Sequence, residues 1–417
     1  MRTVSKTVIG VDFGTQSARA VLVNAENGEI IYSCRKEYPY NSTPVPAIDC
    51  AENLPCATDY EMTLYELLRN VIPEEYRKTV AGICIDATSL TMVLLAEDGR
   101  ALSELDGWSE AAHARVKLWK YHRAQEKADE ALNLASNLQE PFLGRTGGSI
   151  SCEWMLPKLL EVRDEAPEIY SKIDLAMDLC EFLTFRLTGQ LVRSIGSLSY
   201  KCLWAEDLSF PERTFLNGLR AGFYEEYCHF LRGDVRKPGE CAGMLRSELT
   251  KRWGLPEQIP VATGMLDGHT SLATMGAFEP GDAALIVGTS NVCTVQDRKL
   301  QELKDVCGVA QEGMVTGSCG IDTGQSSTGN MLGWFVEHMA GWQIHREAEE
   351  RKISPHQVLA ERIQKPWENK VIAVDWWSGS RNAPCDLTLR GSMSGLEMDT
   401  KTEDIYLALL QAIACGT

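Results

Sequence analysis

A glycine turn near the start of the chain carries the most informative chemistry. Residues 10–17 read GVDFGTQS and lie between two β-rich runs, 7–11 and 19–24. Such a turn lets main-chain N–H groups and Thr or Ser hydroxyls approach phosphate oxygens without a lysine. Asp12, at the end of the first run, can hold a hydrated Mg²⁺ whose other ligands are phosphates. The alternative for these residues is an ordinary surface hairpin.

A second candidate is Asp267, between the glycine-containing segment 261–266 and a predicted helix at 271–275. Near a helix N-terminus a carboxylate stays ionised, which suits a base that accepts a hydroxyl proton as a phosphoryl group arrives. The residues alone leave a simpler role open, in which Asp267 only caps the helix. We interpret His269 as a packing or capping partner, because no second His or Cys lies at metal-ligand spacing.

Weaker signals occur in two further segments. Residues 319–330 are rich in Gly, Ser and Thr and precede an apolar predicted helix at 331–339, which is how an anion site or an ordinary helix begins. Lys201 is a cation in an aromatic stretch, and on its own it is typical of an exposed lysine with a buried stem.

The first hairpin has a counterpart later in the chain. Residues 283–287 predict a strand, 288–290 read Gly-Thr-Ser, and 291–296 predict the returning strand. Two such hairpins suggest two similar domains that face each other, although coincidence is the alternative because Gly-Thr turns are common. The sequence has neither a P-loop motif nor a Rossmann glycine motif.

Strands and helices alternate along the chain, which predicts an α/β fold with a hairpin-rich start. Besides those already named, β-rich runs predict strands at 29–33, 80–85 and 91–96. Helical spacing predicts helices at 61–71, 109–138, 153–162 and 175–187.

Composition narrows the class of protein. The 417 residues suffice for two domains, and the formal net charge of −17 disfavours binding to nucleic acids or anionic membrane surfaces. The 14 cysteines show no disulfide or metal-ligand spacing, and no apolar run approaches the ~20 residues of a membrane helix. We therefore predict a cytoplasmic protein, divided near 256–268.

Taken together and in order, these segments resemble the FGGY carbohydrate kinases of the actin-like ATPase superfamily, and within them the L-ribulokinase branch. The match runs from the first strand to the last residue, and its order is more specific than any one motif. The carrying segments are 10–19, 116–120, His122, Gln125, 153–154, 157–162, 200–201, 264–268, 288–290, 324–326 and 375–377.

The resemblance implies a ribonuclease H-like fold of two domains, 1–266 and 267–417, with a catalytic cleft between them. It implies transfer of the γ-phosphoryl group of ATP, with Mg²⁺, to the terminal hydroxyl of a ketopentose, with L-ribulose, an intermediate of arabinose catabolism, as the expected substrate. The resemblance also leaves open that the protein is a homodimer.

The resemblance also implies roles for individual residues. Asp267 would be the catalytic base, and Asp12 would organise Mg²⁺ through water. The sugar would be bound by Ser89, Lys201, Asp267 and Asp322. The phosphates of ATP would be bound by Gly14, Thr15, Gln16, Ser17, Gly288, Thr289 and Gln325.

Three departures from the family pattern keep alternatives open. Asp322 stands where the branch usually has Glu, and Ala87 where it often has Phe, so a xylulose, D-ribulose or polyol kinase is the first alternative. The chain also stops within the C-terminal domain, before the glycine-rich segment that holds adenosine. We therefore expect either a fragment of a longer product or a truncated, inactive sugar-binding homologue as the second alternative.

Overall fold

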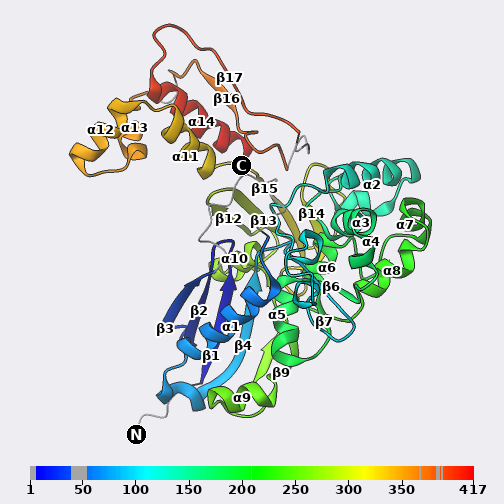
Figure 1. The fold of residues 1–417 in the computed structure, drawn as a ribbon. Helices are drawn as coiled ribbons and strands as arrows, with labels where there is room; N and C mark the ends of the chain where they lie inside the picture. Colours follow the sequence, from blue (N-terminus) through cyan, green and yellow to red (C-terminus); the bar gives the residue numbers. More distant parts are fainter. Residues whose placement is uncertain (1–5, 39–53, 208, 366–367, 382–385, 387) are drawn as a thin grey trace.

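The computed structural model describes the chain except for residues 1–5, 39–53, 208, 366–367, 382–385 and 387. The described chain is a mixed α/β structure with two principal sheets, as predicted. Figure 1 shows the first sheet low in the view, a mainly helical region beside it, and the last elements above.

The first sheet has the strand order β3-β2-β1-β4-β10-β9, and the short β11 also pairs with β4. Its strands are β1 (Thr7–Phe13), β2 (Ser17–Asn24), β3 (Ile30–Glu37), β4 (Val80–Ala87), β9 (Cys241–Met244), β10 (Pro260–Ala262) and β11 (Met265–Leu266). Every second residue of β1 is buried, as expected for a strand with one face in the core. The strands predicted at 7–11, 19–24, 29–33 and 80–85 are confirmed.

Two helices pack on this sheet within one hydrophobic core: α1 (Ala57–Val71) contacts β2 and β3, and α5 (Leu179–Thr188) contacts β4. The helix predicted at 61–71 is therefore confirmed. A third helix, α9 (Ser247–Trp253), contributes Leu249 and Trp253 to the same core.

The helical region has its own core, formed largely by alanine, leucine and aromatic side chains. Its helices are α2 (Gln125–Leu138), α3 (Met155–Glu165), α4 (Pro167–Tyr170), α6 (Ile195–Lys201), α7 (Arg213–Leu219) and α8 (Phe223–Phe230). Short strand pairs join it to the first sheet: β5 (Met92–Leu95) with β6 (Leu175–Asp178), and β7 (Val192–Ser194) with β8 (Asp234–Arg236). Among the described residues, 3₁₀ turns include η3 (Glu74–Thr79), η4 (Leu102–Glu104), η5 (Ala112–Ala114) and η6 (Pro141–Arg145).

The second sheet has the order β12-β13-β15-β14, and all of its neighbours are antiparallel. Its strands are β12 (Ala283–Val287), β13 (Asn291–Asp297), β14 (Gly308–Gln311) and β15 (Cys319–Gln325). In each sheet a glycine-turn hairpin is extended by a later strand that pairs with its second strand, β3 on β2 and β15 on β13. This shared topology supports the predicted duplication. The helix α10 (Asp267–Met275) lies between the sheets and contacts β11, β12 and β13.

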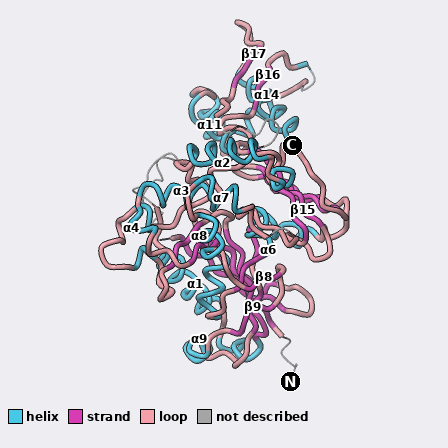
Figure 2. Tube along the Cα trace, turned by 90° about the vertical axis from the view of Figure 1, so that its right-hand side faces the viewer, coloured by secondary structure: helices cyan, strands magenta, loops and turns pink. Residues whose placement is uncertain are grey.

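The remaining elements follow the second sheet, and all of them except β17 contribute to a separate small core. They are α11 (Gly329–His338), α12 (Trp342–Arg351), α13 (Pro355–Arg362), β16 (Ile372–Val374), β17 (Ser392–Ser394) and α14 (Thr402–Gly416). In both Figure 1 and Figure 2 this group projects beyond the main body of the molecule.

Two predicted helices are wrong in part. Residues 109–124 contain only the short η5, and the helix begins at α2. The buried Val116, Lys117 and Leu118 explain the difference, because Lys117 forms a bridge with Met92 of β5 instead of a helical turn. Residues 175–178 form β6 rather than helix, and α5 starts only after the capping Asp178. Tertiary pairing overrides helical spacing in both places.

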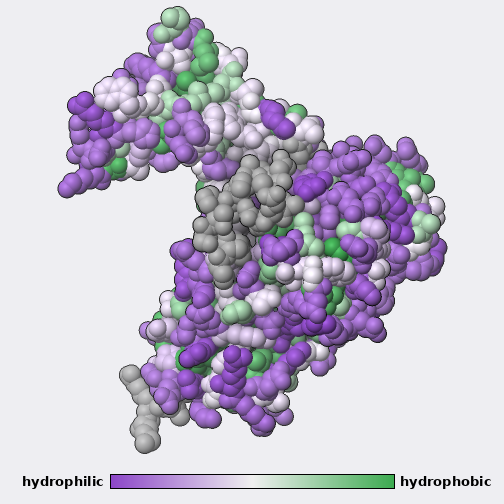
Figure 3. All heavy atoms as spheres, viewed as in Figure 1, coloured by the Kyte–Doolittle hydropathy of each residue, from purple (hydrophilic) through white to green (hydrophobic). Residues whose placement is uncertain are grey.

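The surface and the thiols agree with a globular chain. Figure 3 shows hydrophilic residues over most of the face in view. The cysteines of the described ranges are free; Cys152, Cys180, Cys202 and Cys319 are buried, whereas Cys84 is exposed. Among the described helices, none is both long and apolar enough to cross a bilayer.

Candidate active site

Three carboxylates meet where the strands of the first sheet end. Asp12 of β1 lies opposite Asp86 in the parallel register with β4. The two residues of β11 continue along β4, opposite Asp86 and Ala87, so the chain enters α10 at Asp267 beside the same strand end. Strand register, and not sequence distance, therefore brings these aspartates together. No role was predicted for Asp86 from the sequence. Its position at the end of a buried strand is the signal that could have identified it as a site residue.

Burial sets the acidity of this group. It raises the pKa of Asp86 to about 8, with further increases from the charge and hydrogen bond of Asp12 and from Asp267. It raises the pKa of Asp267 to about 6, with added repulsion from Asp12 and Asp322. The main-chain N–H groups of Gly268 and Ser89 oppose that rise by donating to the Asp267 carboxylate. At neutral pH Asp267 is therefore ionised yet basic enough to accept a proton.

Asp12 and Asp86 together fit a hydrated magnesium ion. Their side chains share a hydrogen bond, so one proton holds two carboxyl groups that would otherwise repel each other. Hard carboxylate oxygens are the ligands that Mg²⁺ accepts, usually with several waters retained. Across the described ranges, no group of three or more His, Cys, Asp or Glu residues could hold a metal ion. This donor set therefore fits an ion whose other ligands are water and phosphate.

The first glycine turn is fixed from outside the hairpin. The Gly14 N–H donates to the Ser17 carbonyl at 3.1 Å, and the Tyr38 hydroxyl donates to the Gly14 carbonyl at 2.8 Å. The Trp119 indole N–H donates to Thr15 Oγ1 at 3.1 Å. Gln16 lies at the tip of the turn. Ser17 begins β2, and its hydroxyl accepts from Arg35 Nε at 3.0 Å.

The second glycine turn is fixed by the start of α11. The Gly288 carbonyl accepts from the Gly329 N–H at 3.0 Å and from Thr328 Oγ1 at 2.9 Å, and the Thr289 carbonyl accepts from the Thr328 N–H at 3.1 Å. A side chain on Gly329 would collide with the Gly288 carbonyl, since its Cβ would lie 2.5 Å from that oxygen. Glycine at 329 therefore allows this close approach.

Gln325 does not offer a free group to a nucleotide in this structure. Its Oε1 accepts from Asn291 Nδ2 at 2.9 Å and from Thr417 Oγ1 at 2.7 Å. Its Nε2 donates to Asp375 Oδ2 at 2.8 Å and to the Ile413 carbonyl at 2.9 Å. All four hydrogen-bonding positions of the amide are used within the protein. These contacts anchor Gln325 to Asn291 of β13, to Asp375 and to the end of α14, and its phosphate contact stays a prediction.

The predicted sugar-binding residues converge from both parts of the chain. Lys201, at the end of α6, lies 3.1 Å from Asp322 Oδ2 of β15, and both side chains are buried. Burial opposes ionisation of Asp322, yet Lys201 and His269 hold the pKa of its carboxyl well below the usual range. The Ser89 hydroxyl is buried and has no partner within the described residues. A buried hydroxyl that has no partner in the protein is suited to hydrogen-bond a hydroxyl of a ligand.

His269 also lies in this group; the packing role predicted for it is confirmed, whereas its approach to Asp322 was not predicted. Its Nε2 lies 3.6 Å from Asp322 Oδ2, and its ring packs edge-on against Tyr200 with 4.8 Å between centroids. Its Nδ1 is buried and unpartnered within the described part of the chain. The signal available in the sequence was its place two residues after Asp267, in the same helical turn.

A second charged group borders the sugar residues. Glu153 accepts from Arg381 at 2.7 Å and lies 3.1 Å from His122, and the Arg381 guanidinium lies over the Trp119 ring at 5.5 Å. Burial alone would raise the pKa of Glu153, but Arg381 and His122 lower it to about 2. Arg381 thus joins the later part of the chain to the helical region.

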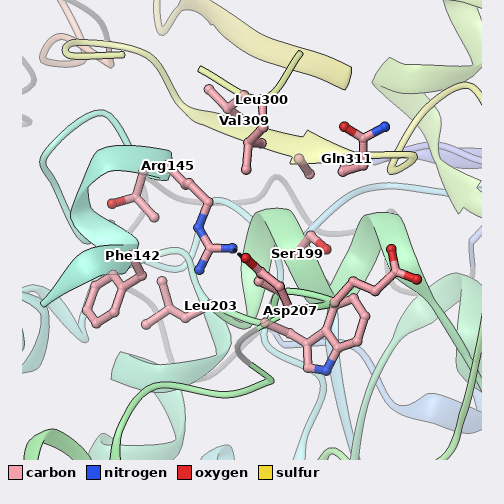
Figure 4. Close-up of a pocket in the computed structure, with 13 residues that line it drawn as sticks. Phe142, Arg145, Ser199, Leu203, Asp207, Leu300, Val309 and Gln311 are labelled. Carbon is pink, nitrogen blue, oxygen red and sulfur yellow. Dashed lines mark ion pairs between the residues drawn. The ribbon is translucent and has the colours of Figure 1, made fainter. Parts of the chain in front are cut away.

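A pocket of about 320 Å³ lies beside this site, between η6, the end of α6 and β14. Figure 4 shows Arg145 directed toward Asp207 in it, below Leu300 and Val309. Its walls include none of the predicted site residues.

Comparison with known proteins places the chain in a family. Residues 7–274 match the N-terminal domain of the FGGY family of carbohydrate kinases, and residues 283–417 match its C-terminal domain. The ribulokinase of Halalkalibacterium halodurans is 33% identical over 423 residues, covering 99% of this chain and 75% of that protein. The ribulokinase of Mycolicibacterium smegmatis is 36% identical over 428 residues, with the same two shares.

The fold also resembles solved structures. The ligand-bound xylulose kinase from Lactobacillus acidophilus superposes with a TM-score of 0.76 at 19% identity. The match covers 98% of this chain and 76% of that one. At this identity the likeness establishes the two-domain α/β fold and nothing more.

Proposed function

Because the chain belongs to the FGGY family of carbohydrate kinases, we propose that it transfers the γ-phosphoryl group of ATP to the terminal hydroxyl of L-ribulose, giving L-ribulose 5-phosphate. The substrate follows from the named relatives, which are ribulokinases. One observation carries the proposal: the buried Asp267 carboxylate interacts both with Asp12 on the metal side and with Asp322 on the sugar side.

Asp267 acts as the general base. Its pKa of about 6 leaves it ionised at neutral pH, and the N–H groups of Gly268 and Ser89 orient the carboxylate. It accepts the proton of the sugar hydroxyl as that oxygen attacks phosphorus in line with the leaving ADP. The proton moves to a carboxylate oxygen, and the P–O bond to ADP breaks as the new one forms.

The sugar is held across both parts of the chain. Lys201 donates to Asp322 and keeps further donor positions for sugar hydroxyls, while His269 Nδ1 and Ser89 Oγ are buried polar atoms left for the sugar. Because Asp322 belongs to β15 and Lys201 to α6, sugar binding also fixes the two parts relative to each other. This excludes water, which would otherwise accept the phosphoryl group.

The two glycine turns bind the phosphates. Gly14, Thr15 and Gln16 on one side and Gly288 and Thr289 on the other present N–H groups and hydroxyls to the transferred group. Asp12 and Asp86 would hold Mg²⁺ through water; when bound, the ion neutralises phosphate charge as it builds up on the leaving oxygen. We assign this metal and ATP as the cofactors.

We further propose that the two domains of the chain meet at 266/267. We also propose that the protein acts in arabinose catabolism and lies in the cytoplasm. Residues 1–266 supply the first phosphate turn and Lys201, and residues 267–417 supply Asp267, the second turn and Asp322. A homodimer stays a prediction of the family resemblance.

The experiment that tests the function measures ADP release from Mg·ATP over a panel of L-ribulose, D-ribulose, xylulose and a polyol. Turnover highest with L-ribulose, and lost in Asp267→Asn, supports the proposal. Turnover highest with another sugar would keep the kinase and change its substrate. No turnover with any sugar, together with retained binding of L-ribulose, would favour a sugar-binding homologue instead.

A further inference from the structure

Leu90 has an unusual main-chain conformation next to the active site. Its φ is +63°, in the left-handed region that side chains other than glycine and asparagine rarely adopt. It lies between β4 and β5, immediately after Ser89, and its side chain is buried in the core of the helical region. Such strain persists only where the surroundings hold it, and it gathers at functional sites.

Both peptide groups of Leu90 are held by buried charged side chains. The Leu90 carbonyl accepts from Lys158 Nζ at 2.7 Å, and its N–H donates to Asp178 Oδ2 at 3.2 Å. The Lys158 ammonium also donates to the carbonyls of Leu118 at 2.9 Å and Lys117 at 3.3 Å. Its three N–H bonds thus all end on main-chain oxygens, which is an unusual use of a fully buried lysine.

The charges around Lys158 do not include a carboxylate in ion-pair contact within the described residues. Glu153 and Asp178 act on it from a distance, Lys117 repels it, and burial lowers its pKa to about 7. Either protonation state keeps at least two N–H donors for the carbonyls. The Lys158 side chain therefore binds main-chain carbonyls and does not neutralise a carboxylate.

The other end of the same loop reaches the base. The Thr88 N–H donates to the Phe13 carbonyl at 2.9 Å, and the Ser89 N–H donates to the Asp267 carboxylate. Since Ser89 and Leu90 share a peptide bond, the conformation of Leu90 sets the direction of the residue that carries this N–H. Asp267 is otherwise faced by Gly268 N–H and by the carboxylates of Asp12, Asp86 and Asp322.

We propose that Lys158 is a positioning residue, which holds Leu90 in the left-handed conformation and thereby keeps the Ser89 N–H on the Asp267 carboxylate. Lys158 touches no reacting group itself; it acts through three consecutive peptide units. The inference rests on the proposed function, because it concerns the base of that reaction.

The test compares Lys158→Met with Lys117→Met as the matched control. Lys117 is equally buried, but its Nζ contacts Glu161 at 3.1 Å and Tyr121 at 3.0 Å and does not touch Leu90. Loss of the Ser89 N–H leaves the Asp267 carboxylate free to turn away from the sugar hydroxyl. At fixed pH and saturating Mg·ATP, kcat with L-ribulose should fall by about tenfold in Lys158→Met while the KM for L-ribulose stays near its wild-type value, and Lys117→Met should leave both close to wild type.

A rescue variant separates positioning from stability. Lys158→Met/Leu90→Gly should return kcat toward the wild-type value, because glycine adopts positive φ without being held. A merely structural lysine predicts the opposite, since the double variant removes a second buried side chain. Hydrogen exchange at the peptide covering Ser89 and Leu90 should be faster in Lys158→Met and unchanged in Lys117→Met, a readout that needs no turnover.

If Lys158→Met does not fold, Asp178→Asn provides the second test. It keeps the side-chain shape while leaving one of the Leu90 and Leu179 N–H groups without its acceptor. It should lower kcat in the same way by a smaller factor. An unchanged kcat in the folded variants, with Asp267→Asn inactive, overturns this inference alone. Full turnover by Asp267→Asn overturns the proposed base instead.

Discussion

Asp12 and Asp86 lie directly opposite each other in the parallel register of β1 and β4, and a hydrogen bond joins their side chains. Two carboxyl groups that share a hydrogen bond cannot both ionise easily without a cation between or beside them. Their pairing links the protonation of the site to metal binding.

Magnesium binding should therefore depend on pH. Because the pKa of Asp86 is raised to about 8, the proton must leave when the ion binds, and apparent Mg²⁺ affinity should increase by up to about tenfold per unit from pH 6 to 8 and level off above. The measurement is the Mg²⁺ concentration for half-maximal ADP release at each pH. Asp86→Asn, which has no titrating proton, should flatten the dependence. An equally steep dependence in this variant would contradict the assignment.

Asp267→Asn should lower kcat by about 10²–10⁴-fold and leave L-ribulose binding nearly intact, because the amide keeps the shape but cannot accept the proton. Initial rates and sugar binding by calorimetry give the two quantities. Asp129→Asn, an exposed position on α2, is the control and should behave as wild type. Substantial turnover by the Asp267 variant would mean that another group is the base.

Asp322→Glu should change the ranking of sugars more than the KM for ATP. The added methylene shifts the carboxylate relative to Lys201 and His269, which lie 3.1 and 3.6 Å from Asp322 Oδ2. The measurement is kcat/KM over the sugar panel together with the KM for ATP. A large change in the KM for ATP with an unchanged sugar ranking would remove Asp322 from the sugar site.

Arg381→Met should destabilise the chain by about 2 kcal/mol, because it leaves the buried Glu153 carboxylate without its closest cation. Adding Glu153→Gln should restore part of the loss, since a neutral amide no longer requires the charge. Thermal unfolding of both single variants and the double variant forms the cycle. Strictly additive effects would show that the two side chains do not interact energetically.

Gln325→Ala should lower stability by about 1–3 kcal/mol and leave the KM for ATP unchanged. The reason is that Asn291, Thr417, Asp375 and Ile413 already use every hydrogen-bonding position of the amide. Denaturant unfolding and ATP-dependent initial rates are the measurements. A variant of wild-type stability with a much higher KM for ATP would restore the predicted phosphate contact.

The local pattern of the sequence determined the hairpins. Alternation of buried and solvent-facing residues specifies β1 and β2, and a glycine turn specifies where they reverse, so the strands and both Gly-Thr turns were predictable from neighbouring residues. The order of the motifs also identified the family. Local spacing misled at 109–124, where Val116 and Leu118 are buried by pairing with a strand and not by a helix.

Tertiary structure decided which of those residues share a site. Lys201 and Asp322 are 121 positions apart, and only the packing of α6 against the second sheet makes them an ion pair. His269 approaches Asp322 only in the folded chain, and Gln325 is anchored there by partners on α14 and its C-cap. In the sequence, Lys158 is one residue of an apolar predicted helix. Only the structure shows that its ammonium binds the carbonyl of Leu90, 68 positions away, whose φ is +63°. The sequence determines the chemistry that each side chain can perform. Long-range strand register, burial and the hydrogen bonds already made within the protein determine which side chains lie together and remain available for a ligand.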